Sequence, residues 1–323
     1  MARILTGIQS SNIPHMGNIL GAVRPAISLS KQGGNSSIYF IADLHSLTSI
    51  KDAAFRREST HAVAATWLAF GFDTDANILF RQSDVAEVCE LSWYLSCFMP
   101  FQRLQLAHSF KDKAENLADV NGGLFTYPML MAADILLYDT NIVPVGKDQQ
   151  QHVEFTRYVA ERVNHHYQEE IFVIPDFQID EQVMTVPGTD GRKMSKSYGN
   201  FINIFLPEKE LKKVVMGIVT DSKPLEAPKD PETDNVFALY KLLGTAEQTE
   251  ALRAKYLAGN FGYGHAKTAL LELILDVFKN EREAYSRYMS DKGLLEAELK
   301  KGEDKARAIA MPVLERVRKV LGF

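Results

Sequence analysis

The chain has 323 residues, 46 % of them hydrophobic and 24 % charged, which is typical of a globular protein with one large domain or two ordinary ones. No apolar run reaches the roughly 20 residues of a membrane-spanning helix, and the first residues lack a signal-peptide pattern, so we expect a cytoplasmic protein. The net charge of −5 argues against a chain that is basic throughout, but it allows a local basic face.

Five short apolar runs in the first two hundred residues predict strands, at 4–5, 38–42, 76–80, 141–145 and 171–174. Helical patterns separate them, at 19–32, 52–70, 86–98, 127–138 and 149–164. This alternation predicts an α/β fold with a Rossmann-like parallel sheet. Ligands of such sheets bind beyond the carboxyl ends of the strands.

The two cysteines, Cys89 and Cys97, lie eight residues apart. A zinc site needs about four ligands at short spacing, so we predict no metal site in the protein itself. We expect both thiols to be reduced, at core or boundary positions of a helix.

The pattern changes near residue 206. A Pro-rich, charged segment at 223–234 is followed only by helical patterns. We therefore expect an α/β domain at 1–205 and an all-helical domain at 206–323, whose last helix could pack back on the first domain. Six basic residues of the second domain form either one basic face or ordinary solvated charges: Arg282, Arg287, Lys300, Lys301, Lys305 and Arg307.

The segment 7–18 (GIQSSNIPHMGN) is a polar loop between a predicted strand and a predicted helix. Backbone N–H groups at a helix start favour an anion, and a glycine lets a flat base approach the backbone. His15 and Asn18 add donors for phosphate or ribose. Taken alone, the loop fits a simple connection and a nucleotide site equally well.

A second polar segment, 191–197 (GRKMSKS), predicts a mobile surface loop. Lysine-rich loops are usually only solvated. The complete signature at 193–197 (KMSKS), together with the residues at 15–18 (HMGN), makes a chance occurrence a poor explanation.

With these two motifs, the sequence resembles the class I aminoacyl-tRNA synthetases, and among them the bacterial tryptophanyl-tRNA synthetases. Further matching stretches are 7–9, 126–138 and 143–152, with Glu154, Thr156 and Arg157. The chain departs from the family at 10–12, where Ser-Ser-Asn stands in place of Pro-Ser-Gly, and at Lys147, where an acidic residue is common.

The resemblance implies a tryptophan–tRNA ligase that converts L-tryptophan and ATP to tryptophanyl-adenylate and pyrophosphate. It then transfers tryptophan to the 3′ end of its tRNA. The resemblance also implies Mg²⁺ held mainly through the ATP phosphates, a helical domain that binds the tRNA anticodon, and a homodimer.

The resemblance also assigns residues. Lys193, Lys196 and Asn18 would be catalytic. The implied ATP-binding residues are Gln9, Ser10, Ser11, His15, Gly17, Asn18, Gly146, Lys147, Asp148, Val183, Lys193, Met194, Ser195, Lys196 and Ser197. The implied tryptophan-binding residues are Leu5, Gly7, Gln9, His45, Tyr127, Met131, Asp134, Val143, Val145 and Gln149.

Asp134 is the one carboxylate in the apolar segment 129–138 (MLMAADILLY). Tyr127, Met131 and Asp134 are spaced i, i+4, i+7 and share a helix face. A carboxylate there needs a donor, which could be a structural partner or the N–H of a bound indole. The resemblance favours the indole.

Three other functions are compatible with parts of this pattern. A tyrosine-specific sister synthetase would also suit a pocket with a carboxylate. A small-molecule adenylyltransferase would share the first motif but would not need a long helical domain. A synthetase-like RNA-binding protein without catalysis predicts eroded ATP motifs, whereas Gly17, Asn18, Lys193 and Lys196 are all present.

Overall fold

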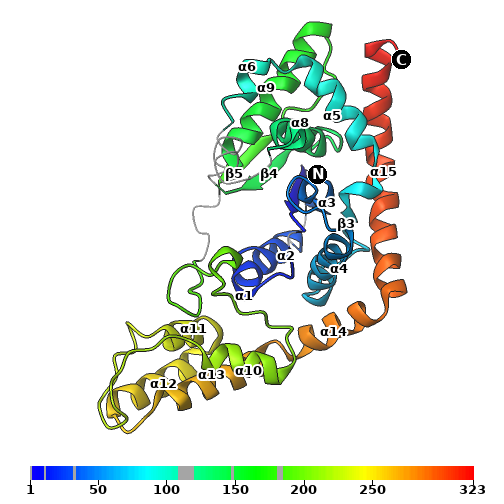
Figure 1. The fold of residues 1–323 in the computed structure, drawn as a ribbon. Coiled ribbons are helices and arrows are strands. Elements are labelled where there is room, and N and C mark those ends of the chain that lie inside the picture. Colours follow the sequence, from blue (N-terminus) through cyan, green and yellow to red (C-terminus); the bar gives the residue numbers. More distant parts are fainter. Residues whose placement is uncertain (1, 11, 32–33, 108–119, 147–148, 180–184) are drawn as a thin grey trace.

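A computed structural model describes residues 2–10, 12–31, 34–107, 120–146, 149–179 and 185–323. Its centre is a five-stranded parallel sheet in the order β3-β2-β1-β4-β5 (Figure 1). The strands are β1 (Ala2–Ile8), β2 (Asn35–Ile41), β3 (Ile78–Arg81), β4 (Ile142–Val145) and β5 (Asp176–Ile179). The predicted α/β fold with a parallel sheet is confirmed.

The sheet reverses its strand order at β1, which pairs with β2 on one side and with β4 on the other. The chain therefore leaves the carboxyl ends of β1 and β4 toward opposite faces of the sheet, which opens a crevice between them. Strand β2 is buried from Ser37 to Ile41, as expected when helices cover both faces of a parallel sheet.

The strand predicted at 171–174 is wrong, because β5 lies at Asp176–Ile179. Ile171 and Phe172 are buried, but they are not in a strand. The side chain of Asn164 accepts hydrogen bonds from both of their N–H groups and donates one to the carbonyl of Phe172. These backbone groups are thus satisfied without a neighbouring strand.

The other strand predictions and all five helix predictions are confirmed with shifted ends. The helices of this part are α1 (Met16–Asn18), α2 (Arg24–Ser30), α3 (Asp43–Ser46), α4 (Ala53–Ala69), α5 (Glu87–Phe98), α6 (Phe101–Leu104), α8 (Gly122–Leu136) and α9 (Gln150–Tyr167), with a π-helical turn at Ile19–Val23. Helix α8 begins five residues earlier than predicted, because the Asn121 side chain caps it by accepting from the N–H of Leu124. Cys89 and Cys97 are both in α5, but they are exposed, so the expected core or boundary position is wrong.

The chain continues through α10 (Glu208–Met216), α11 (Asn235–Leu243), α12 (Ala246–Ala258), α13 (Tyr263–Val277), α14 (Lys279–Ser290) and α15 (Lys292–Leu321). Helices α10 to α13 enclose their own apolar core. That core also takes in Met16, Ile19 and Met194, so residues of both sequence motifs are packed against this helical part. In the described part of the chain, no helix is long and apolar enough to cross a membrane.

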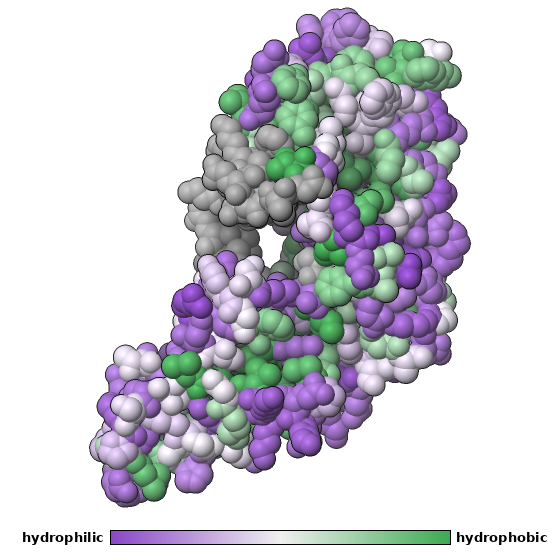
Figure 2. All heavy atoms as spheres, viewed as in Figure 1, coloured by the Kyte–Doolittle hydropathy of each residue, from purple (hydrophilic) through white to green (hydrophobic). Residues whose placement is uncertain are grey.

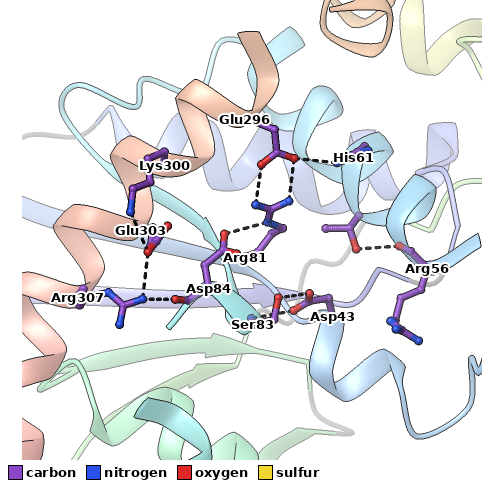
Figure 3. Close-up of polar contacts among 11 residues, drawn as sticks. Asp43, Arg56, His61, Arg81, Ser83, Asp84, Glu296, Lys300, Glu303 and Arg307 are labelled. Carbon is purple, nitrogen blue, oxygen red and sulfur yellow. Dashed lines mark hydrogen bonds and ion pairs between the residues drawn. The ribbon is translucent and has the colours of Figure 1, made fainter. Parts of the chain in front are cut away.

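Helix α15 runs back along the sheet and packs on β3 (Figure 1). A Cβ atom on Gly302 would lie 1.7 Å from the carbonyl oxygen of Leu79, so the two backbones touch. Arg81 donates to both carboxylate oxygens of Glu296, at 2.8 and 2.7 Å, and to Asp84 at 2.9 Å (Figure 3). The edge that α15 presents to solvent is largely hydrophilic (Figure 2).

Of the six basic residues that could form a basic face or be ordinary helix charges, most are engaged within the chain. Arg282 donates to the carbonyls of Ile204 and Leu206, and Lys305 to those of Thr74 and Asp75. The others pair with neighbouring side chains: Lys300 with Glu303 and Asp304, Lys301 with Asp75 and Glu298, Arg307 with Glu87 and Glu303. For these residues the alternative of structural and solvated helix charges fits the structure better.

Candidate active site

A cavity of about 360 Å³ opens at the carboxyl ends of β1 and β4, where the strand order reverses. All ten residues predicted for tryptophan line it: Leu5, Gly7, Gln9, His45, Tyr127, Met131, Asp134, Val143, Val145 and Gln149. They come from β1, α3, α8 and β4 and from the residues that follow these strands. Topology thus gathers side chains that lie far apart in the sequence.

Residues of β1 and α8 determine the shape and polarity of this cavity. Gly7 lies against the ring of Phe40, and a Cβ atom at Gly7 would approach that ring to 2.5 Å. Tyr127, Met131 and Asp134 of α8 all face the cavity, as their spacing predicted. The cavity therefore has apolar walls and a carboxylate on one side.

Asp134 is only 2 % exposed, and both of its carboxylate oxygens accept hydrogen bonds. Nε2 of His45 lies 2.8 Å from Oδ2. Nε2 of Gln82 lies 2.8 Å from Oδ1 and 2.8 Å from Oδ2. Burial raises the pKa of Asp134, and the contacts with His45 and Gln82 oppose this rise by stabilising the ionised form.

The polar end of the cavity is formed by Tyr127 and Gln149. The Tyr127 hydroxyl donates to Oε1 of Gln149 at 3.4 Å. The Tyr127 ring is held edge-on between the rings of His45 and His152, at centroid distances of 5.1 and 4.9 Å. A hydroxyl and an amide side by side can bind an ammonium group through their oxygens.

The first motif forms a reciprocal cap at the start of α1. Nδ1 of His15 accepts from the N–H of Asn18 at 3.2 Å, and Oδ1 of Asn18 accepts from the N–H of His15 at 3.2 Å. This pattern requires a His15 ring that is unprotonated at Nδ1. Burial, helped by the nearby Lys196 ammonium, lowers the pKa of His15 to about 4.

The second motif is in contact with the first. The N–H of Gly17 donates to the sulfur of Met194 at 3.3 Å, and the N–H of Met16 donates to the carbonyl of Ile202 at 2.8 Å. Met194 is buried.

The two lysines of this motif differ in environment. Lys193 is exposed, and its backbone pairs with Pro187 in a short antiparallel bridge. Lys196 is half-buried, and burial lowers the pKa of its ammonium group. Ser195 accepts from the N–H of Ser197, which starts a short 3₁₀ turn at Lys196–Tyr198.

The remaining residues predicted for ATP are divided between the cavity, the core and the part of the chain that is not described. Gln9 and Gly146 line the cavity. Ser10 is fully buried, and its hydroxyl is hydrogen-bonded to that of Ser46 at 3.0 Å, so its side chain is not at the cavity. Ser11, Lys147, Asp148 and Val183 lie outside the described residues.

Sequence reasoning did not identify Gln82 as part of the site. It follows β3 and bonds Asp134 from behind. Its position after an apolar strand, in the polar run 81–83, was the one available signal. Among the described residues, no group of three His, Cys, Asp or Glu side chains could hold a metal ion.

The fold is that of a class of tRNA-charging enzymes. A family model described as tRNA synthetases class I (W and Y) matches residues 1–279, and the chain belongs to this family. It is 46 % identical to the tryptophan–tRNA ligase of Fusobacterium nucleatum, over 100 % of this chain and 98 % of that protein. It is 44 % identical to the tryptophan–tRNA ligase of Rhodopirellula baltica, over 99 % of each chain.

A solved structure of tryptophanyl-tRNA synthetase from Campylobacter jejuni, complexed with ADP and tryptophan, superimposes with a TM-score of 0.96. It is 44 % identical to this chain and covers 99 % of this chain and 100 % of its own. The similarity therefore extends over both the sheet and the helical part.

Proposed function

We propose that the protein is a tryptophan–tRNA ligase that activates L-tryptophan with ATP and transfers it to the 3′ end of its tRNA. The observation that carries this proposal is a buried carboxylate, Asp134, facing an apolar cavity at the β1–β4 crevice, in a chain whose full-length relatives are tryptophan–tRNA ligases.

Tryptophan would lie in this cavity with its indole between the apolar side chains of Leu5, Met131, Val143 and Val145. Asp134 would accept the indole N–H. A side chain without that N–H would leave a buried carboxylate short of a donor, at a cost of about 1–3 kcal/mol. Tyr127 and Gln149 would bind the α-amino group, which suits their adjacent oxygens.

ATP would lie between the two motifs. Gln9, Gly17 and Asn18 would contact it from the first motif, with His15 holding that loop in shape. Met194, Ser195 and Ser197 would shape the opposite wall, and Gly146 would lie at the end of β4. Ser10, Ser11, Lys147, Asp148 and Val183 remain predictions from the resemblance.

The first step is an in-line displacement at phosphorus. A tryptophan carboxylate oxygen attacks the α-phosphorus of ATP, the bond between this phosphorus and the bridging oxygen breaks, and pyrophosphate leaves with that oxygen. In the second step a terminal ribose hydroxyl of the tRNA attacks the carbonyl carbon, and AMP leaves. No protein nucleophile is needed, so catalysis rests on positioning and on stabilisation of charge.

Lys193, Lys196 and Asn18 would supply that stabilisation. The ammonium groups of the two lysines would neutralise charge on the departing pyrophosphate, more strongly where water is excluded. Mg²⁺ would accompany ATP, held mainly by the phosphates, as this ion commonly is.

The partners and the domain roles complete the proposal. Residues 1–205 would catalyse, and residues 206–323 would bind the tRNA anticodon region, with α15 linking the two. The cytoplasm is the compartment where tRNA is charged, and we place the protein there.

A homodimer is supported by one exposed face. Cys89, Trp93 and Cys97 are spaced i, i+4, i+8 on α5, and all three are exposed, Trp93 by 69 %. Phe101 and Leu106, just beyond, are 57 % and 58 % exposed. Large apolar side chains that are exposed to solvent close together in the sequence are compatible with a protein interface.

Amino-acid-dependent exchange of pyrophosphate into ATP tests the activation step, with each of the twenty amino acids supplied alone. We expect tryptophan to support exchange and tyrosine to support little or none. Exchange that is faster with tyrosine would favour the sister synthetase. No exchange with any amino acid would favour a non-catalytic RNA-binding protein.

A further inference from the structure

Gln82 connects three elements through one buried amide. It is 1 % exposed and begins the 3₁₀ turn Gln82–Asp84 that follows β3. Its Nε2 donates to both oxygens of Asp134 on α8. Its Oε1 accepts from the N–H groups of Leu44 and His45 on α3, at 3.1 and 3.4 Å.

One oxygen of the Asp134 carboxylate has unused capacity to accept a hydrogen bond. A carboxylate oxygen can accept about two hydrogen bonds. Oδ2 already accepts from His45 and from Gln82, whereas Oδ1 accepts from Gln82 alone among the contacts of the described residues. Oδ1 therefore retains room for one more donor, and Asp134 lines the cavity.

Gln82 is itself held in place from outside the cavity. The neighbouring Arg81 forms a two-point contact with Glu296 of α15 and a third contact with Asp84 (Figure 3). Ser83 donates to Asp43 through its N–H and its hydroxyl, at 3.0 and 2.5 Å. The residues on both sides of Gln82 are thus anchored, which restricts the position of its amide.

We propose that Gln82 is a positioning residue for amino-acid selection, which orients the Asp134 carboxylate so that Oδ1 is free to accept the indole N–H. This inference rests on the proposed role of Asp134 as the acceptor. Gln82 lies behind the carboxylate and not among the residues that line the cavity, so it acts through Asp134. Gln82 also donates hydrogen bonds to both oxygens of Asp134, which favours the ionised form of the carboxylate.

Loss of the Gln82 amide should affect the choice between substrates with and without an indole N–H. Without Gln82, the carboxylate of Asp134 can rotate about its side-chain bonds, and His45 alone determines which oxygen is occupied. The N–H group of the substrate then forms a less well aligned hydrogen bond with the Asp134 carboxylate. A substrate without that donor loses nothing at this position, so the discrimination between the two should decrease.

The test compares tryptophan with its benzothiophene analogue, in which sulfur replaces the indole N–H. The ratio of kcat/KM for the two substrates is measured by pyrophosphate exchange in the wild type, Gln82→Met and Asp134→Ala. We expect Asp134→Ala to raise the KM for tryptophan strongly with little change for ATP. We expect Gln82→Met to lower the ratio by about 5- to 100-fold, mainly through the KM for tryptophan.

Ser83→Ala is the matched control, because it removes a contact to the start of α3 from the adjacent residue and leaves the Asp134 contacts in place. The backbone N–H of residue 83 still donates to Asp43 in this variant, so Gln82 stays anchored and the ratio should equal that of the wild type. Should Gln82→Met fail to fold, Gln82→Asn replaces it, since its amide is one methylene too short to bridge α3 and α8. It should change the ratio in the same direction.

The results that would refute the positioning role of Gln82 differ from those that would refute the role of Asp134 as the acceptor. If Asp134→Ala abolishes the selectivity and Gln82→Met keeps it within about twofold, the role of Gln82 is refuted alone. A Gln82→Met enzyme that loses activity equally on both substrates, or a Ser83→Ala enzyme that loses selectivity as well, would show a purely structural role. If Asp134→Ala retains the selectivity, the proposed acceptor is wrong and this inference falls with it.

Discussion

At the scale of single residues, Lys196 has the two properties that a side chain needs to stabilise the departing pyrophosphate. It carries a positive charge, and it is half-buried beside the first motif, where its ammonium disfavours protonation of His15. A charge that is partly withdrawn from water interacts more strongly with a developing anion. The exposed Lys193 shares the sequence signature but not this environment.

Lys196→Ala should slow adenylate formation by about 10²–10³-fold, with a small effect on the KM for tryptophan. The measurement is the single-turnover rate of tryptophanyl-adenylate formation. Lys212→Ala, an exposed lysine on α10, is the control and should react normally. A normal rate in Lys196→Ala would refute the role in leaving-group stabilisation.

His15 predicts a dependence of stability on pH. Its folded-state pKa of about 4 is below the unfolded value of 6.5, so the unfolded chain takes up the proton first as the pH falls. The contribution to stability is therefore complete above pH 6.5, is lost progressively toward pH 4 and levels off below it. Protonation at Nδ1 would also break the cap to Asn18.

Denaturant unfolding of the wild type and of His15→Asn between pH 7 and pH 4 checks this prediction. Asparagine can cap a helix but does not titrate in this range. The wild type should lose more stability than the variant over the interval, and other groups should cancel in the difference. Parallel curves for the two proteins would contradict the lowered pKa of His15.

The sequence predicts some of these residues well and others not at all. The shared face of Tyr127, Met131 and Asp134 follows from helical spacing, which is local information. The contact between Gln82 and Asp134 joins residues 52 apart, and no local pattern encodes it. Asn12 has a φ of 119°, a left-handed conformation that favours glycine, which accounts for the glycine usual in the family at this position.

At the scale of elements, helix α15 and strand β3 are in direct backbone contact at Gly302. Because the Gly302 backbone lies against that of Leu79, any side chain must push helix and strand apart. Gly302→Ala should lower the free energy of unfolding by about 1–3 kcal/mol, although alanine is the better helix former. The measurement is equilibrium unfolding in urea.

Gly264→Ala is the control for this substitution. Gly264 is in helix α13, and a Cβ atom there would meet no atom within 4 Å. Its stability should be unchanged or slightly higher. If Gly302→Ala is as stable as Gly264→Ala, helix α15 is not held directly against the strand.

The positions of the helices and strands along the chain were predictable wherever apolar periodicity determines them. Four of the five predicted strands and all five predicted helices follow from the alternation of short apolar runs and amphipathic segments. The run at 171–174 failed because a single side chain, Asn164, satisfies its backbone groups. Such a cap depends on one residue of the preceding helix, which hydrophobic periodicity does not reveal.

At the scale of the whole molecule, the exposed face of α5 predicts a dimer. Trp93→Glu should convert the protein from a dimer, with about twice the chain mass, to a monomer of 36.3 kDa. The reason is that the dimer interface would bury the new carboxylate without a partner, which is costly. Light scattering after size exclusion measures this. Leu257→Glu, at a residue of α12 that is 56 % exposed, should remain dimeric.

A wild-type protein that is monomeric at micromolar concentration would contradict the proposed dimer. So would a Trp93→Glu variant that keeps the mass of the wild type. Either result would bear on the proposed dimer and would not test the assignment of the cavity at β1 and β4.

The central claim, that this chain charges tRNA with tryptophan, is tested most directly by the complete reaction. Labelled tryptophan or tyrosine is supplied with ATP, Mg²⁺ and a bacterial tRNA transcript specific for either amino acid, and acid-stable aminoacyl-tRNA is counted. We expect ATP-dependent attachment of tryptophan to the tryptophan tRNA and no charging with tyrosine. Charging with tyrosine, or tryptophan activation without any transfer to tRNA, would contradict it.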